Sequence, residues 1–113
     1  MSGITTHVLD QALGAPARNV PVRLEWLRDD AWHLVAERRT DDDGRVRDLL
    51  PEGQPPMLGT YRLTFGVAEY FQRLGIMTFY TEVPVVFVVR DSERHHHVPL
   101  LVSPFGYSTY RGS

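Results

Sequence analysis

The sequence predicts one domain of the mainly β class, an antiparallel β-sandwich of seven to eight strands with one short α-helix. Three observations support this fold class. Short segments that alternate apolar and polar residues recur along the chain, turn-forming stretches such as DDDG and PEGQPP separate them, and a single segment has helical spacing. A chain of 113 residues suits one hydrophobic core, so residues 1–113 are expected to form a single domain.

The first half of the chain consists mainly of predicted strands. In VPVRLEWLR, residues 20–28, Val22 and Leu24 alternate with Arg23, the period of a strand that meets water on one face. The Asp29-Asp30 pair that follows predicts a hairpin, because aspartate tolerates turn conformations. The strands expected in this half are residues 4–10, 20–28, 32–40 and 60–65.

The second half contains the predicted helix and three further strands. GVAEYFQRLG, residues 66–75, has apolar residues at helical spacing and ends on Gly75, which suits a helix C-terminus. VPVVFVV, residues 83–89, is apolar at nearly every position, so we expect the core on one face and a partner subunit on the other. HHHVPLLVS and YSTY, residues 95–103 and 107–110, are also expected to be strands.

Composition excludes several classes of function. Without cysteine the chain has no disulfide and no thiolate nucleophile, and without lysine it cannot form a Schiff base. The formal net charge of −2 gives no basic surface for nucleic acid. The first residues lack the pattern of a secretory signal, and no segment has the roughly 18 apolar residues of a membrane span. We therefore expect a cytoplasmic protein that binds neither nucleic acid nor membrane.

Histidines offer the main candidate chemistry. An extended backbone places His95 and His97 on one face and His96 on the other. Two imidazoles on one face could bind zinc, together with a carboxylate such as Glu93, or share a proton transfer. A solvated, histidine-rich strand start is an equally simple interpretation. His7 lies among β-branched residues, where a structural histidine is the more usual explanation.

Two polar segments remain open to more than one interpretation. Arg45 follows the DDDG turn, and such a residue is most often a solvated charge. The C-terminal segment, residues 107–113, could be a frayed end, yet it offers a phenol, a guanidinium, a hydroxyl and a carboxylate for binding a polar heterocycle. A serine nucleophile has no support, because the G-x-S-x-G elbow is absent.

Four stretches together resemble the 5-hydroxyisourate hydrolases, the transthyretin-related enzymes of purine breakdown. They are THVLDQALGAPARNVPVRL, TDDDGR, TFYTEVPVVFVV and HHHVPLLVSPFGYSTYRGS. The final Tyr-Arg-Gly-Ser separates these hydrolases from transthyretin itself. The resemblance implies a transthyretin-like sandwich, a homotetramer built as a dimer of dimers, and no cofactor or metal. It also implies that water opens the lactam ring of 5-hydroxyisourate, giving 2-oxo-4-hydroxy-4-carboxy-5-ureidoimidazoline in urate degradation.

The resemblance also assigns roles to individual residues. The catalytic residues that it implies are His7, Arg45 and His97. The substrate-binding residues that it implies are Arg45, Tyr110, Arg111 and Ser113. Histidine suits the activation of water near neutral pH, and a guanidinium suits a developing oxyanion.

One position departs from the pattern of these hydrolases, and two other functions remain as alternatives. His96 stands where the family usually has tyrosine between two histidines. The first alternative is a transthyretin-like carrier that binds a small ligand without chemistry, and the second is a histidine-rich metal module.

Overall fold

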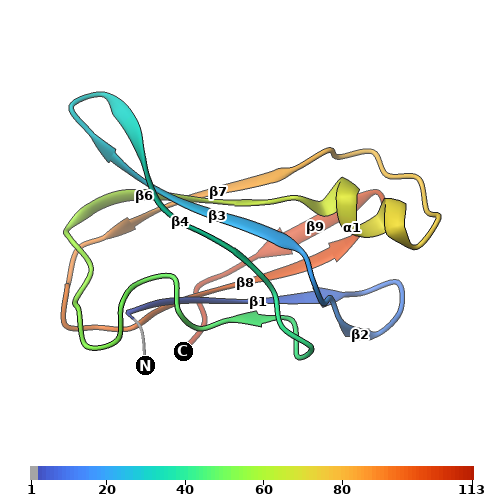
Figure 1. Cartoon of the computed structure of the whole chain (residues 1–113), viewed down its shortest axis with the longest axis horizontal. Helices are drawn as coiled ribbons and strands as arrows, with labels where there is room; N and C mark the ends of the chain where they lie inside the picture. Colours follow the sequence, from blue (N-terminus) through green and yellow to red (C-terminus); the bar gives the residue numbers. More distant parts are fainter. Residues whose placement is uncertain (1–2) are drawn as a thin grey trace.

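The computed structural model describes residues 3–113 and shows two β-sheets stacked as layers, with one short helix at an end of the sandwich (Figure 1). The fold class expected from the sequence is confirmed. The elements in chain order are β1 (Ile4–Asp10), β2 (Ala15–Pro16), β3 (Pro21–Arg28), β4 (Ala31–Arg39), β5 (Arg45–Val46), β6 (Gly59–Phe65), α1 (Val67–Arg73), β7 (Val83–Val89), β8 (His96–Ser103) and β9 (Gly106–Thr109). The two shortest, β2 and β5, are the strands that the sequence did not indicate.

Each layer has a simple strand order. One sheet runs β4-β3-β6-β7, and every pair in it is antiparallel. The other runs β2-β1-β8-β9, with β5 paired to the same edge of β1 as β2. The pairing of β1 with β8 is parallel, so the expectation of a wholly antiparallel sandwich is wrong at this pair. Strands so far apart in the chain can pair in either direction, because a long connection lets the chain return from either end.

The core lies between the inner faces of the two sheets. Strand period two sends alternate side chains inward, and the residues with no exposed surface include Val8, Leu24, Leu63 and Leu100. The same alternation holds in β7, where Val83 and Val89 are buried while Val86 is 58% and Val88 37% exposed. The core contact expected for one face of this strand is confirmed. Cover of its outer face by a partner stays a prediction.

The helix ends as its sequence predicts. Gly75 has a φ of 74°, the left-handed conformation that glycine adopts without steric strain. Its N–H donates to the carbonyl of Gln72 at 3.0 Å, and the next N–H, of Ile76, donates to the carbonyl of Phe71 at 2.9 Å. This pair of hydrogen bonds is a Schellman motif, which satisfies carbonyls at the helix end. No helix in residues 3–113 has the length and apolar character needed to span a membrane.

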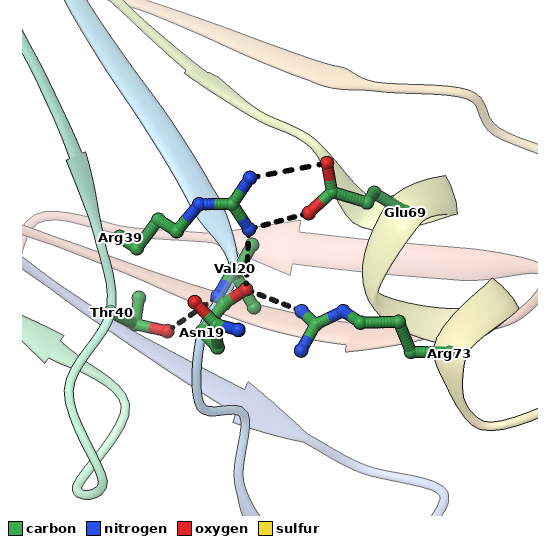
Figure 2. A network of polar contacts seen from close by, with 6 residues as sticks. All are labelled: Asn19, Val20, Arg39, Thr40, Glu69 and Arg73. Carbon is green, nitrogen blue, oxygen red and sulfur yellow. Dashed lines mark hydrogen bonds and ion pairs between the residues drawn. The ribbon is translucent and has the colours of Figure 1, made fainter.

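An arginine network ties α1 to the sheet (Figure 2). Nη1 of Arg39 on β4 contacts Oε2 of Glu69 on the helix at 2.5 Å and donates to the Asn19 carbonyl at 3.4 Å. Nη2 of Arg73 donates to the same carbonyl. Asn19 itself has a φ of 60°, a conformation that asparagine tolerates better than most residues. The network therefore fixes the turn before β3 and the helix together.

Candidate active site

Strand pairing brings three sequence-predicted residues to one part of the sheet. The antiparallel register of β1 and β5 places His7 opposite Arg45. The parallel register of β1 and β8 places Thr5 opposite His97. Two strand pairings on opposite edges of β1 therefore collect two imidazoles and a guanidinium that lie far apart in the chain.

A cavity of about 240 Å³ opens at this place. The residues that line it are Thr5, Thr6, Arg45, Arg47, His95, His97 and Ser113. It contains two of the three predicted catalytic residues, Arg45 and His97, and the last residue of the chain. His7 does not line this cavity, although Arg45 lowers the pKa of both His7 and His97, so the three groups interact electrostatically.

Arg45 is presented by a turn that Asp41 organises. One carboxylate oxygen of Asp41 accepts the backbone N–H groups of Asp43 and Arg45, each at 2.9 Å. The other accepts from Nη1 of Arg47 at 2.8 Å. These bonds stabilise the carboxylate, and they lower the pKa of Asp41, with the Arg45 N–H as the largest cause. The turn expected from the DDDG sequence is therefore present, and its hydrogen bonds fix the backbone at Arg45, where β5 begins.

The turn requires glycine at position 44, because of its backbone conformation and its close approach to β1. Its φ is 77°, and a Cβ at this position would collide with the carbonyl oxygen of Val8. The backbone comes so close because the N–H of Val8 donates to the Gly44 carbonyl at 2.7 Å. A side chain here would push the turn off β1 and displace Arg45 with it.

A hydrogen bond to the main chain fixes the tautomer of His7. Its Nε2 lies 2.9 Å from the carbonyl oxygen of Asp43, and a carbonyl can only accept, so Nε2 carries the hydrogen and Nδ1 the lone pair. Burial lowers the pKa of His7, and the charge of Arg45 lowers it further. The imidazole is therefore mainly neutral at pH 7.

His97 is also kept neutral. Burial is the largest cause of its lowered pKa, followed by the charges of Arg45, His95 and His7. Its Nδ1 lies 2.8 Å from the hydroxyl oxygen of Thr5. A neutral, hydrogen-bonded imidazole beside a guanidinium is suited to accept a proton from water near neutral pH.

The C-terminal segment is fixed against His97. The N–H of Gly112 donates to the His97 carbonyl at 2.8 Å, and a Cβ on Gly112 would lie 2.5 Å from Cδ2 of the His97 ring. Only a glycine lets the backbone approach the ring this closely. The contact brings Ser113 to the cavity, so the interpretation of this segment as a frayed end is wrong.

Tyr110 and Arg111 lie on a different side of His97. Together with His96 and side chains of β7 they line a mostly apolar hollow of about 140 Å³, which His97 also borders. The structure of one chain therefore places only Ser113, of the three predicted C-terminal binding residues, in the cavity with Arg45.

The three adjacent histidines divide as the extended backbone predicts. His95 and His97 share a face, with ring centroids 6.2 Å apart, whereas His96 is buried on the other face. Within residues 3–113 no group of three or more His, Asp or Glu side chains is arranged to hold a metal ion. His95 and His97 instead both contact the hydroxyl of Thr5.

Sequence reasoning missed Thr5, Asp41 and the steric need for Gly112. Thr5 and His97 are 92 residues apart, and only the pairing of β1 with β8 makes them neighbours. The one usable signal for Asp41 was its place at the head of the turn before Arg45, since aspartate side chains often accept nearby backbone N–H groups.

A larger hollow of about 460 Å³ lies elsewhere, beside α1. Its charged lining includes Arg39 and Glu69, which are already paired with each other. It contains no histidine, so we assign the candidate active site to the smaller cavity.

Comparison with known proteins agrees with the fold. The model of the HIUase/Transthyretin family matches residues 4–112. The 5-hydroxyisourate hydrolase 2 of Rhizobium meliloti (strain 1021) is 47% identical over 114 residues, covering 97% of this chain and 95% of that protein.

Solved structures give the same result. The 5-hydroxyisourate hydrolase of Klebsiella pneumoniae superposes with a TM-score of 0.87 at 34% identity, covering all of both chains. Transthyretin from Sparus aurata superposes with a TM-score of 0.91 at 30% identity, covering 99% of this chain and 97% of that one. The resemblance and the transthyretin-like fold expected from the sequence are confirmed, and the chain belongs to the HIUase/Transthyretin family.

Proposed function

We propose that the protein hydrolyses 5-hydroxyisourate, opening its lactam ring in the degradation of urate. The observation that carries this proposal is the cavity in which Arg45, His97 and Ser113 meet, with His7 held beside Arg45. The 47% identity to a 5-hydroxyisourate hydrolase over nearly the whole chain supports the same substrate. The Tyr-Arg-Gly-Ser motif at residues 110–113 favours the hydrolase over a ligand carrier.

The proposed reaction needs no covalent intermediate. An imidazole takes a proton from water as the water oxygen adds to the lactam carbonyl carbon, and the carbonyl becomes an oxyanion. The guanidinium of Arg45 stabilises that charge by donating hydrogen bonds. The oxyanion then reforms a C=O bond, the ring C–N bond breaks, and the leaving nitrogen takes the proton from the imidazolium. The product is a ring-opened carboxylic acid, so all atoms of water are retained.

His7 and His97 both qualify as the base, because each is neutral and lies near Arg45. His97 is the stronger candidate, since it borders the cavity and His7 does not. In this proposal His97 activates water and His7 relays protons. Ser113 contacts substrate or water.

Tyr110 and Arg111 remain substrate-binding residues in the proposal. His97 borders both the hollow that they line and the cavity that contains Arg45.

We also propose that the chain forms a homotetramer, a dimer of dimers, in the cytoplasm. Exposed aromatic side chains support association. Phe79 and Phe105 are both largely exposed, and the loops that carry them are joined by the hydrogen bond from the N–H of Phe79 to the carbonyl of Pro104 at 2.9 Å. Apolar surface of this kind is typical of a protein interface.

Replacement of His97 tests the assignment. We expect His97→Asn to lower the turnover of 5-hydroxyisourate by roughly 10²–10⁴-fold if His97 is the general base. His33→Asn is the matched control, because His33 lies on β4, does not line the cavity, and has its ring Nε2 3.3 Å from the Arg28 carbonyl oxygen. Turnover by a folded His97→Asn protein at the rate of the control would remove His97 from this role.

A further inference from the structure

We propose that Thr5 and His95 are positioning residues that hold neutral His97 in one tautomer, with the hydrogen on Nδ1 and the lone pair on Nε2. The consequence for turnover rests on the proposed function above, whereas the tautomer itself can be measured without substrate.

The geometry that supports this proposal is a chain of two hydrogen bonds through one hydroxyl. Oγ1 of Thr5 lies 2.7 Å from Nε2 of His95 and 2.8 Å from Nδ1 of His97. Thr5 is only 5% exposed, and strand register fixes it opposite His97. The two partners of the hydroxyl are therefore set by the fold.

A hydroxyl has one hydrogen, so its two bonds must differ in direction. If Thr5 donates to His97, then Nδ1 of His97 holds the lone pair and His95 donates to Thr5. If Thr5 donates to His95, then Nδ1 of His97 carries the hydrogen and donates to Thr5. The two arrangements place the basic nitrogen of His97 on opposite sides of the ring.

The surroundings of Thr5 favour the second arrangement. The main chain of Thr5 also raises the His97 pKa, which is the effect of a carbonyl that accepts a hydrogen from the ring. A main-chain carbonyl only accepts, and Nδ1 is the His97 ring nitrogen that lies against Thr5, so the hydrogen is favoured on Nδ1. The relay then runs from His97 Nδ1–H to the Thr5 oxygen, and from the Thr5 hydroxyl to His95 Nε2.

This direction leaves Nε2 of His97 as the base. Among the hydrogen bonds found in residues 3–113, none engages this nitrogen. The charged and titratable groups that face His97 are Arg45 from β5, His7 from β1 and neighbouring His95, and all three disfavour its protonation. With the ring neutral, the tautomer decides whether the ring can accept a proton from water at Nε2.

The test uses a nitrogen-15 NMR spectrum of the histidine rings, recorded without substrate above the pH at which His97 titrates. Wild type is expected to show His97 with the hydrogen on Nδ1. Thr5→Val keeps the branched shape but removes the hydroxyl, and we expect it to mix the two tautomers. Thr5→Ser keeps the hydroxyl and is expected to restore the wild-type signal.

A second variant keeps the test decisive if Thr5→Val does not fold. His95 is exposed, so His95→Ala leaves the core intact. Without its acceptor, the Thr5 hydroxyl is free to donate to His97 Nδ1, and the tautomer with the hydrogen on Nε2 is expected to gain population. A matched control is Thr64→Val, which removes a hydroxyl from an equally buried strand threonine that has no hydrogen-bond partner in residues 3–113.

Kinetics measure the consequence of the tautomer. We expect Thr5→Val and His95→Ala to lower kcat by about 10–100-fold with little change in KM, the size of effect typical of a misplaced catalytic group. Thr64→Val and Thr5→Ser are expected to keep wild-type kcat.

Two results would overturn the proposal. One is a wild-type His97 with its hydrogen on Nε2, and the other is an unchanged Nδ1–H tautomer in both Thr5→Val and His95→Ala. Absence of turnover by wild type would instead contradict the proposed function, and the NMR result would still decide the role of Thr5 and His95.

Discussion

At the scale of single residues, the site depends on keeping its imidazoles neutral. Burial and the guanidinium of Arg45 lower the pKa of His7 and His97, so the base is available at neutral pH. His96 lies outside this site. It is 5% exposed, and its Nδ1 has no hydrogen-bond partner in residues 3–113.

The pH dependence of activity follows from these shifts. Both candidate bases have a pKa below the usual 6.5, so each loses its proton at a lower pH than a free histidine. The kcat/KM of the enzyme is therefore expected to be constant near pH 7 and to fall with a midpoint below pH 6.5. A kcat/KM profile for 5-hydroxyisourate with a midpoint above pH 6.5 would contradict a lowered pKa of the catalytic imidazole.

His96 is expected to be a weak point for stability. An unpaired polar atom in a buried position destabilises a fold by about 1–3 kcal/mol, so His96→Phe should raise the free energy of unfolding by about 1 kcal/mol at pH 7. Burial lowers the pKa of His96, and the unfolded chain therefore binds its proton more readily. The free energy of unfolding of the wild type therefore falls as the pH drops below 6.5, because the unfolded chain takes up this proton. His96→Phe has no such proton to bind, so the difference in stability between the two proteins should grow at low pH.

Urea unfolding of both proteins at pH 7 and at pH 5 measures this difference. Equal stability of wild type and His96→Phe at both pH values would contradict this prediction.

At the scale of elements, the sequence predicted which segments form strands but not how they pair. Period two identified β3 and β6, and the Asp29-Asp30 turn indicated β4 as the strand after β3. Apolar, β-branched or aromatic stretches identified β1, β7, β8 and β9. Pairing depends on the whole chain, so neither the parallel partnership of β1 with β8 nor the contact of Thr5 with His97 could be read from local pattern. Strands β2 and β5 are too short to show any period.

The contact between the C-terminal segment and β8 gives a prediction at this scale. Gly112→Ala should displace the His97 ring, because the new Cβ would lie 2.5 Å from its Cδ2 atom. We expect turnover to fall by roughly 10–100-fold with little loss of thermal stability, since the segment lies at the end of the chain. Gly106→Ala is the matched control, because its Cβ would have an ordinary contact of 3.7 Å with Ser103. Equal activity of the two variants would show that the close approach of Gly112 does not position His97.

At the scale of the whole molecule, a single chain contains the cavity with Arg45 and His97 but places Tyr110 and Arg111 beside another hollow. The candidate residues themselves were found through the family resemblance. Composition and period alone favoured a structural histidine for His7, a solvated charge for Arg45 and a frayed C-terminal segment. What the structure adds is the spatial relation between them.

Assembly is tested by light scattering. We expect a mass about four times the 12.9 kDa of one chain. Phe79→Asp should lower this mass, because it places a charge in the exposed aromatic surface formed with Phe105. Leu34→Asp changes an exposed apolar residue on β4 and should leave the mass unchanged. A wild-type mass of one chain would contradict the tetramer.

The most direct test of the central claim is the decay of 5-hydroxyisourate absorbance, with substrate freshly made from urate and wild-type protein added at increasing concentrations. We expect a decay rate that rises in proportion to the protein concentration. A rate equal to that of the spontaneous reaction at every concentration would contradict the central claim.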